Sequence, residues 1–321
     1  MKRIAFSICF TLCLVCLLGS VAAAADWPSK SVSFVIGFSA GGGADITARA
    51  VFQPHVEKIL GQKFVITYKP GSNGEISYTE LAKTTKPDGY TIAWGAHPGF
   101  LTIPLTKPNC KFVLEDFQPV ANISTDPNIF IVKGNSEFDT LQDIVEYAKA
   151  NPGKLSVAIG ALNADDDLAC EQFIKSAGIE VNKIVYADGT TDRVTATMGG
   201  HVQVGVINAS EVSPYAKQVK VLGVMSHERL DFMASVPTFA EEGYAVFNSS
   251  DRGVLMPAGV PEEIVKKLSD AIGEAMQDPE CVKSLNNLNL IPHYMDYKTY
   301  TEDLHKMREI YREIIAGNTA S

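Results

Sequence analysis

The 321-residue sequence is short of cysteine, and its only long apolar run lies at one end. Three of the six cysteines, at positions 9, 13 and 16, lie within that run, which extends from Ile4 to Leu18. The other three, Cys110, Cys170 and Cys281, are scattered along the chain. They offer no metal-ligand spacing and at most one disulfide, whose pairing the sequence does not assign. We therefore expect no metal site built on cysteine.

The apolar run follows Lys2 and Arg3 and gives way to small residues that end at Ala25. It is shorter than the roughly 20 residues that a bilayer core requires, and its flanks are typical of a secretory signal peptide. Because Val15 rather than a small residue precedes Cys16, a lipoprotein anchor is not expected. The sequence predicts a signal peptide at 1–25, cleavage after Ala25 and a soluble periplasmic protein.

Positive charge is also scarce. Without Lys2 and Arg3 the chain keeps 26 basic against 37 acidic residues, a net charge of −11. This balance argues against binding to nucleic acid or to anionic membrane surfaces. No lysine follows the glycines in the Walker pattern and no G-x-G-x-x-G spacing is present, so nucleotide binding is not expected either. No cofactor is predicted.

The sequence does contain a glycine-rich break between two regular elements. The apolar run 33–36 predicts a strand, and apolar spacing from Ile46 to Leu60 predicts a helix that ends at Gly61. Between them lie three consecutive glycines, 41–43, followed by Asp45 as a helix-capping residue. Glycines at a helix N-terminus let an anion approach the unpaired backbone N–H groups closely. This stretch predicts a small-anion site.

Two further loops follow predicted strands. The strand at 63–68 leads into the glycine-rich turn 70–74 and a helix at 76–83, and the strand at 90–94 leads into 95–99. Strands followed by loops and helices are typical of a parallel α/β sheet, which binds ligands at the carboxyl ends of its strands. We expect the three loops to converge on one rim.

The alternation of strand and helix restarts near residue 122, which predicts a second α/β lobe. A further strand near 253–256 and a helix opened by Pro261 follow the second lobe. The expected strands of the second lobe are 129–132, 155–159, 183–186, 202–207 and 219–224, and its expected helices are 141–150, 168–177 and 192–198.

An ordered series of short motifs runs through nearly the whole chain after position 26. They are Trp27-Pro28, Phe38-Ser39-Ala40-Gly41-Gly42-Gly43 with Asp45 and Arg49, Lys69-Pro70-Gly71-Ser72-Asn73-Gly74, Lys86-Pro87-Asp88-Gly89-Tyr90, Asn151-Pro152-Gly153-Lys154-Leu155, Gly199-Gly200-His201-Val202, Val236-Pro237-Thr238, Arg252-Gly253 and Pro257-Ala258-Gly259-Val260-Pro261. The series resembles the substrate-binding receptors of tripartite tricarboxylate transporters, the Bug-type extracytoplasmic solute receptors.

The resemblance implies an α/β fold of the two-lobed, type II-like periplasmic-binding-protein clamshell, each lobe having a central, mostly parallel sheet flanked by helices. Lobe 1 is expected at 26–122 plus 247–321, and lobe 2 at 123–246. The resemblance also implies a non-catalytic monomer that captures a small organic carboxylate between the lobes and delivers it to an integral-membrane permease. The family's ligand-binding loops map onto 39–45 and 72–74 in the first lobe and onto 160–167 and 188–191 in the second.

The resemblance and the strand ends together give one set of candidate ligand-binding residues. They are Phe38, Ser39, Ala40, Gly41, Gly42, Gly43, Asp45, Ser72, Asn73, Gly74, Ala96, His97, Gly160, Ala161, Asn163, Asp165, Asp166, Asp188 and Asn208. Arg252 is either a surface charge or half of an interlobe ion pair.

The second lobe departs from the family pattern at Asp165, Asp166 and Asp167, which replace a loop rich in hydroxyl groups. Three interpretations remain open: charges that stabilise the first turn of a helix, contacts to a ligand amine or hydroxyl, or a divalent cation site. Ionised aspartates only accept hydrogen bonds and repel a second ligand carboxylate. The working hypothesis is a monocarboxylate with a hydroxyl, amine or apolar remainder.

A different class of function is also compatible with one motif. The segment Gly37-Phe38-Ser39-Ala40-Gly41 matches G-x-S-x-G, the nucleophile elbow of serine hydrolases, with His97, His201 or His227 as the base. The match lies too near the start of the mature chain to leave room for the preceding strand and oxyanion loop. A hydrogen bond from Ser39 to the ligand is the preferred interpretation.

Overall fold

A computed structural model describes residues 27–319 except positions 39, 42, 161, 187–189 and 289. The predicted signal peptide and the candidate residues Ser39, Gly42, Ala161 and Asp188 lie outside the described residues.

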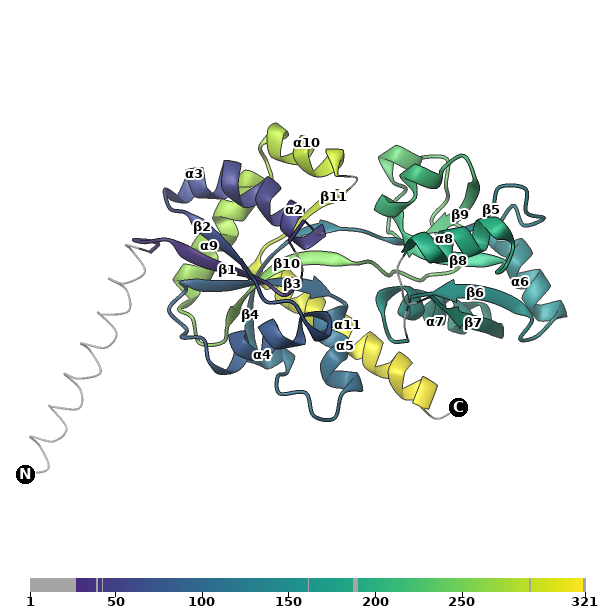
Figure 1. Cartoon of the computed structure of the whole chain (residues 1–321), viewed down its shortest axis with the longest axis horizontal. Coiled ribbons are helices and arrows are strands. Elements are labelled where there is room, and N and C mark those ends of the chain that lie inside the picture. The colour runs from purple at the N-terminus through teal and green to yellow at the C-terminus, as the bar shows by residue number, and fades with distance from the viewer. Residues whose placement is uncertain are drawn as a thin grey trace, which may run out of the picture.

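The protein has two sheets in separate halves (Figure 1). The first sheet has the order β11-β4-β10-β3-β1-β2. Its strands are β1 (Val32–Ile36), β2 (Phe64–Tyr68), β3 (Thr91–His97), β4 (Phe117–Thr125), β10 (Asp251–Pro257) and β11 (Ile291–Met295). The second has the order β7-β6-β8-β5-β9. Its strands are β5 (Asn128–Lys133), β6 (Leu155–Ile159), β7 (Val181–Val185), β8 (Val204–Asn208) and β9 (Val219–Val224).

The two-lobed α/β fold is confirmed, but both sheets are mixed. Pairing is parallel across β2-β1-β3 and β7-β6-β8, whereas β10, β4 and β11 pair antiparallel, as do β8, β5 and β9. The reason lies in the chain path: β4 leads out to the second lobe and β10 leads back, so the two strands run in opposite directions. The predicted boundary after 122 falls inside β4, which stays in the first sheet to Thr125.

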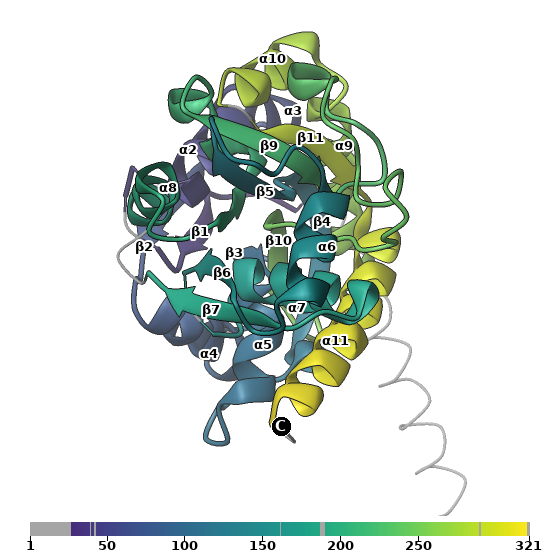
Figure 2. The same cartoon turned by 90° about the vertical axis from the view of Figure 1, so that its right-hand side faces the viewer.

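Helices flank both sheets. They are α2 (Gly43–Val51), a π-helical turn (Phe52–Val56), α3 (Glu57–Leu60), α4 (Glu75–Lys83), α5 (Gly99–Thr106), α6 (Leu141–Ala150), α7 (Asp165–Ala177), α8 (Thr190–Gly199), α9 (Glu262–Ala275), α10 (Pro279–Asn287) and α11 (Tyr297–Thr319). Short 3-10 turns lie at 72–74, 114–116, 209–211, 213–215 and 231–233. In Figure 2, where the second lobe faces the viewer, α8 covers one face of its sheet and α6 and α7 the other.

Two predicted boundaries in the site region are wrong. The helix expected at 168–177 begins at Asp165, so the three aspartates form its first turn rather than the preceding loop. The loop expected at 95–99 is shorter because β3 continues to His97, held by its antiparallel pairing with β10. The predicted end of the first helix at Gly61 is confirmed, since this residue has the left-handed φ of 69° that glycine adopts easily.

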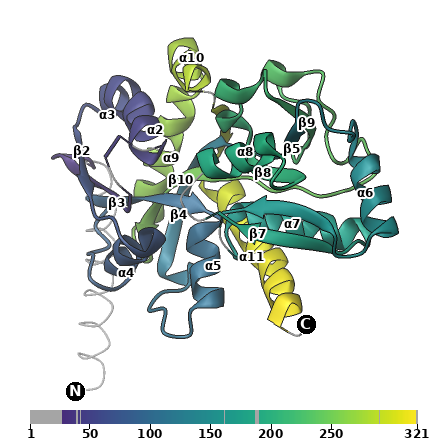
Figure 3. The same ribbon diagram turned by 45° about the vertical axis from the view of Figure 1, so that its right-hand side comes forward.

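The cores follow the apolar periodicity. Helix α9 buries Ile264, Leu268 and Ile272 on one face. These residues belong to the same core cluster as Phe34 of β1 and Trp94 of β3 in the first sheet. Helix α11 contributes Tyr300, Tyr311 and Ile314 to a cluster on the other face of that sheet, and this cluster also contains Leu168 of α7. Helix α11 therefore contacts both lobes, and Figure 3 shows it running from the first lobe along the second. Within the described part of the chain, no helix is both long and apolar enough to span a membrane.

Candidate functional site

Glycines bring the three first-lobe loops together. A Cβ on Gly37 would lie 3.0 Å from the Cα of Gly74 and would collide with the hydroxyl of Ser77, so the loop after β1 packs directly on the loop after β2. A Cβ on Gly99 would lie 3.1 Å from the side-chain nitrogen of Asn73, so the third loop lies beside the second. The predicted convergence of the loops is confirmed.

Asp45 holds the first glycine loop in shape. Its carboxylate accepts hydrogen bonds of 2.8 Å from the Gly41 amide, the Tyr68 hydroxyl and Arg49 Nε. Burial opposes ionisation, but the hydrogen bonds from Gly41 and Tyr68 and the charge of Arg49 outweigh it and lower the pKa of Asp45. Asp45 is therefore positioned to shape the loop around Gly43, while Phe38 packs against the first-lobe core.

The second loop presents exposed polar side chains. Ser72, Asn73 and Gly74 have φ values of 49°, 55° and 89°, an unusual run of left-handed residues directly before α4. Ser72 and Asn73 are exposed at this position, and Gly74 is buried against Tyr78. The loop therefore offers hydroxyl and amide groups on the rim that the first loop shares.

Arg252 of β10 lies next to the first glycine loop. A Cβ on Gly43 would be 3.6 Å from Arg252 Nη2, and the same nitrogen lies 3.4 Å from Asp126 Oδ2. The side chain is only 17% exposed, and its Nη1 is buried with no hydrogen-bond partner among the described residues. An unpaired buried donor is costly, and an acceptor on a ligand would remove that cost.

Asp126 connects this arginine to the second lobe. It is buried and accepts hydrogen bonds from the backbone N–H and the hydroxyl of Ser210, at 2.9 and 2.5 Å. Burial raises the pKa of Asp126 to about 6, and the charge of Arg252 opposes that rise. The next residue, Glu211, accepts a hydrogen bond of 2.7 Å from the Thr190 hydroxyl at the start of α8.

A second guanidinium lies on the far side of the Ala209–Glu211 turn. Arg193 of α8 donates to the Thr190 hydroxyl at 3.0 Å, and its Nη1 lies 3.6 Å from Asp166 Oδ2. A Cβ on Gly160 would be 2.5 Å from Arg193 Nη1, so only glycine allows this approach. Arg193 Nε is buried without a partner among the described residues.

Together these contacts form one continuous series from the first glycine loop to the loop after β6. The order is Gly43, Arg252, Asp126, Ser210, Glu211, Thr190, Arg193, Asp166 and Gly160. Two arginines, each with a buried N–H that lacks a partner among the described residues, flank the 209–211 turn. Planar guanidinium groups with free donors suit carboxylate oxygens, so this arrangement is the candidate site.

The three aspartates have internal partners. Asp165 accepts hydrogen bonds from the side-chain amides of Asn128 and Asn208, at 3.1 and 3.0 Å. Asp166 accepts from the Gly160 amide and faces Arg193. Asp167 accepts from the Asn163 amide at 2.7 Å and from Lys183 at 2.6 Å.

These contacts favour the first of the three interpretations, in which the aspartates stabilise the start of α7. Two of the three carboxylates face a basic side chain, so the second lobe does not present three unpaired negative charges to a ligand. Burial and the neighbouring Asp165 raise the pKa of Asp166 to about 7, which Arg193 opposes. Among the described residues, no group of three or more His, Cys, Asp or Glu side chains is arranged to hold a metal ion.

The prediction that His97 joins the glycine loops is wrong. In the antiparallel pairing of β3 and β10, Ala96 lies opposite Arg252 and His97 lies opposite Asp251. Directly opposed residues share a face and successive residues alternate, so His97 faces away from Arg252. His97 instead contacts Tyr311 of α11, with Nε2 3.4 Å from the hydroxyl, and lines a separate cavity. The error follows from ending β3 too early.

The same cavity contains His227, whose ring stacks on Phe247 at 4.0 Å. Two of the three histidines named as bases for the hydrolase alternative are thus turned away from the glycine loops. Ser39 itself lies outside the described residues.

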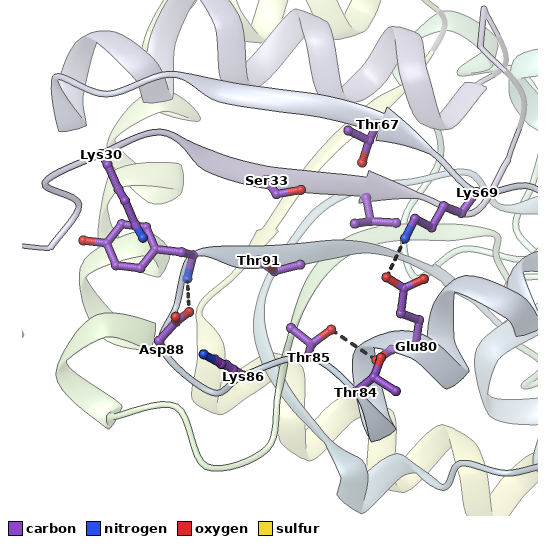
Figure 4. Close-up of a pocket in the computed structure, with 12 residues that line it drawn as sticks. Lys30, Ser33, Thr67, Lys69, Glu80, Thr84, Thr85, Lys86, Asp88 and Thr91 are labelled. Atoms are coloured by element: carbon purple, nitrogen blue, oxygen red, sulfur yellow. Dashed lines mark hydrogen bonds and ion pairs between the residues drawn. The ribbon is translucent and has the colours of Figure 1, made fainter.

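Another hollow, of about 540 Å³, lies over β1, β2 and β3 (Figure 4). Its lining includes Ser33, Thr67 and Thr91, and also three lysines. Lys69 pairs with Glu80 at 2.5 Å, Lys30 lies over the Tyr90 ring at 4.5 Å, and Lys86 is the third. The hollow shares no described residue with the candidate site.

Sequence reasoning missed Arg193 and Asp126. The sequence does contain a signal for Arg193. A cation in the first turn of a helix interacts unfavourably with the helix dipole, so its presence there indicates a role other than helix stabilisation. Asp126 had no such signal, since its role depends on the crossing between lobes.

Comparisons with known proteins agree with this architecture. The profile of the "Tripartite tricarboxylate transporter family receptor" family matches residues 47–316. The "UPF0065 protein in gbd 5'region" of Cupriavidus necator is 32% identical over 283 residues, 88% of this chain and 85% of that one. A ligand-free TctC solute binding protein from Polaromonas has a TM-score of 0.83 at 27% identity, covering 91% of this chain and 99% of that one. R. palustris Rpa4515, solved with adipate, has a TM-score of 0.73 at 26% identity, covering 90% and 97%. The chain therefore belongs to the tripartite tricarboxylate transporter receptor family.

Proposed function

We propose that this solute receptor captures a small organic carboxylate between its two lobes and delivers it to the membrane permease of a tripartite tricarboxylate-type transporter. The observation that carries the proposal is the pair of buried guanidinium groups, Arg252 and Arg193, that flank the 209–211 turn, each with one N–H that lacks a partner among the described residues. The first glycine loop lies beside one of them and Gly160 beside the other.

The expected hydrogen-bond energies are large enough to support micromolar binding. Hydrogen bonds to charged groups contribute about 1.5–3 kcal/mol each, so four of them give about 6–12 kcal/mol before the cost of association. Micromolar affinity requires about 8 kcal/mol. Four such bonds are barely sufficient once the cost of association is subtracted, so we expect both lobes to contribute.

The internal pairing of Asp166 and Asp167 changes the expected ligand. The sequence-based argument for a monocarboxylate assumed free negative charge in the second lobe, whereas these carboxylates face Arg193 and Lys183. One guanidinium on each side of the turn favours a dicarboxylate over a monocarboxylate. The relative solved with adipate, itself a dicarboxylate, supports the same class.

The test is a thermal-shift panel of mono-, di- and tricarboxylates of three to eight carbons, followed by calorimetry on the acid with the largest shift. Mass spectrometry of acids released by mild denaturation supplies candidates beyond the panel. We expect saturable binding of a dicarboxylate by a monomer, as judged by light scattering. Stabilisation by monocarboxylates alone contradicts the dicarboxylate assignment, and a panel with no shift contradicts carboxylate capture.

A further inference from the structure

The strands that cross between the lobes have two faces, and the candidate carboxylate site uses only one. Asp126 and Arg252 point to the glycine loops, whereas their neighbours Thr125 and Asp251 point the other way, because side chains alternate along extended chain. On that second face lies a cavity of about 990 Å³, which we name the hinge cavity. Its walls come from the 225–232 segment of the second lobe, the crossing residues 247–251, and α10, β11 and α11 of the first lobe.

The hinge cavity has an excess of carboxylates. Glu228, Asp231, Asp251 and Asp303 line it, and among its described lining residues the only lysine or arginine is Arg229, which pairs with Glu241 at 2.9 Å. Asp251 is buried, and its hydrogen bonds within the described part of the chain come from the hydroxyls of Thr125 and Ser249, at 2.6 and 2.7 Å.

No basic side chain of the described residues pairs with Asp251 or Asp303 within salt-bridge distance. Burial raises the pKa of Asp303 and the neighbouring Asp251 reinforces the rise, whereas His97, Lys306 and His293 oppose it. Two neighbouring carboxylates that have no salt-bridge partner among the described residues attract a cation.

A histidine provides a second, independent indication of a ligand. His97 lines the hinge cavity and is only 2% exposed, and its Nδ1 is buried with no hydrogen-bond partner among the described residues. The Tyr311 hydroxyl donates to Asn248 Oδ1 and lies 3.4 Å from His97 Nε2, so Nε2 is assigned as the donor and Nδ1 is the nitrogen left to accept a hydrogen bond. A protonated amine has several N–H donors and satisfies His97 and a carboxylate together.

The remainder of the lining is apolar. Apolar side chains that line the cavity include Met225, Phe232, Phe247, Leu290, Met295 and Met307, and Phe232 is half exposed. Methionine side chains adapt to ligands of irregular shape. The cavity volume lies at the upper end of the range found for small-molecule sites.

We propose that the hinge cavity is a second binding site, for an amphipathic organic cation whose ammonium group lies among Asp251, Asp303 and His97 and whose hydrocarbon part lies among the methionine and phenylalanine side chains. A bare metal ion is a poorer occupant, because no metal-binding cluster is found among the described residues and the apolar walls would stay unfilled. The site is separate from the carboxylate site, on the opposite face of the crossing strands.

The test uses n-hexylammonium as the probe and 1-hexanol as the matched uncharged probe, measured by calorimetry and ligand-observed NMR on the mature chain at pH 7. Hexylammonium is expected to bind saturably, and hexanol at least tenfold more weakly. Asp303→Asn is expected to weaken hexylammonium binding about tenfold or more, because it removes a charge with little change of shape. Glu302→Gln, an exposed neighbour on the same helix, is the control and is expected to have no effect.

Two further variants keep the proposal testable if Asp303→Asn disturbs the fold. Phe232→Ala removes a half-exposed apolar wall and is expected to weaken the probe severalfold without loss of thermal stability. Arg193→Gln, in the carboxylate site, is expected to leave hexylammonium binding unchanged. The proposal is overturned by absence of saturable hexylammonium binding, by equal affinity for hexanol, or by a well-folded Asp303→Asn protein with wild-type affinity.

Discussion

Replacing Arg252 with glutamine tests the candidate carboxylate site most selectively among single substitutions. The change removes the guanidinium that lies beside Gly43 and pairs with Asp126 at 3.4 Å. Loss of one or two charge-assisted hydrogen bonds to a ligand carboxylate costs about 3 kcal/mol, or on the order of 100-fold in affinity.

The substitution also leaves Asp126 buried without its counter-charge, so its pKa, already raised to about 6, is expected to rise further. Asp126→Asn combined with Arg252→Gln removes that effect. The double variant is expected to fold normally and still bind the carboxylate about 100-fold more weakly than the wild type.

Calorimetry with the dicarboxylate selected from the panel is the assay, with circular dichroism to verify the fold. Arg308→Gln is the matched control, because the Arg308 side chain is 18% exposed and pairs with Glu115 at 2.5 Å, but it lies on α11 away from the glycine loops. An affinity for the folded double variant within threefold of the wild type would refute the assignment of Arg252 to the site.

Three further predictions concern the loops and the buried carboxylates. Gly37→Ala is expected to reduce the free energy of unfolding by about 1–3 kcal/mol in urea titration, because its Cβ overlaps Ser77 and presses on Gly74; unchanged stability would mean that the two loops are not in contact. Because the pKa of Asp166 is raised to about 7, the folded state keeps a proton that the unfolded state loses near pH 4. The free energy of unfolding therefore falls as the pH rises from about 4 to 7, by at most about 1.4 kcal/mol per pH unit. Asp166→Asn is expected to flatten this slope, and an equal slope in both proteins contradicts the assignment. The lowered pKa of Asp45 gives the opposite sign: its contribution to stability is present above pH 4 and is lost as the pH falls further. Asp45→Asn is expected to remove this acid sensitivity in thermal melts between pH 2 and 5. A variant with the wild-type pH profile would contradict this prediction.

Much of the fold was predictable because it depends on local signals. The strands 155–159 and 219–224 and the helix 141–150 were predicted with the bounds that the structure has, because each is an apolar run or amphipathic repeat between clear breaks. The convergence of the glycine loops also followed from strand direction alone.

The parts that could not be predicted depend on long-range pairing. His97 was placed on the wrong face because the extra residues of β3 are held by β10, a strand more than 150 positions later in the sequence. The aspartates of α7 were treated as free charges because nothing nearby in sequence identifies Arg193 and Lys183 as their partners. The arrangement of Arg252, Asp126 and Ser210 depends on how the chain crosses between the lobes.

A crystal structure of the protein with the dicarboxylate selected from the panel tests the central claim most directly. One carboxylate group is expected within hydrogen-bond distance of Arg252 Nη1 beside the first glycine loop, and the other within reach of Arg193 near Gly160. A ligand bound away from both arginines, with Arg252 Nη1 and Arg193 Nε still unpaired, would contradict the account.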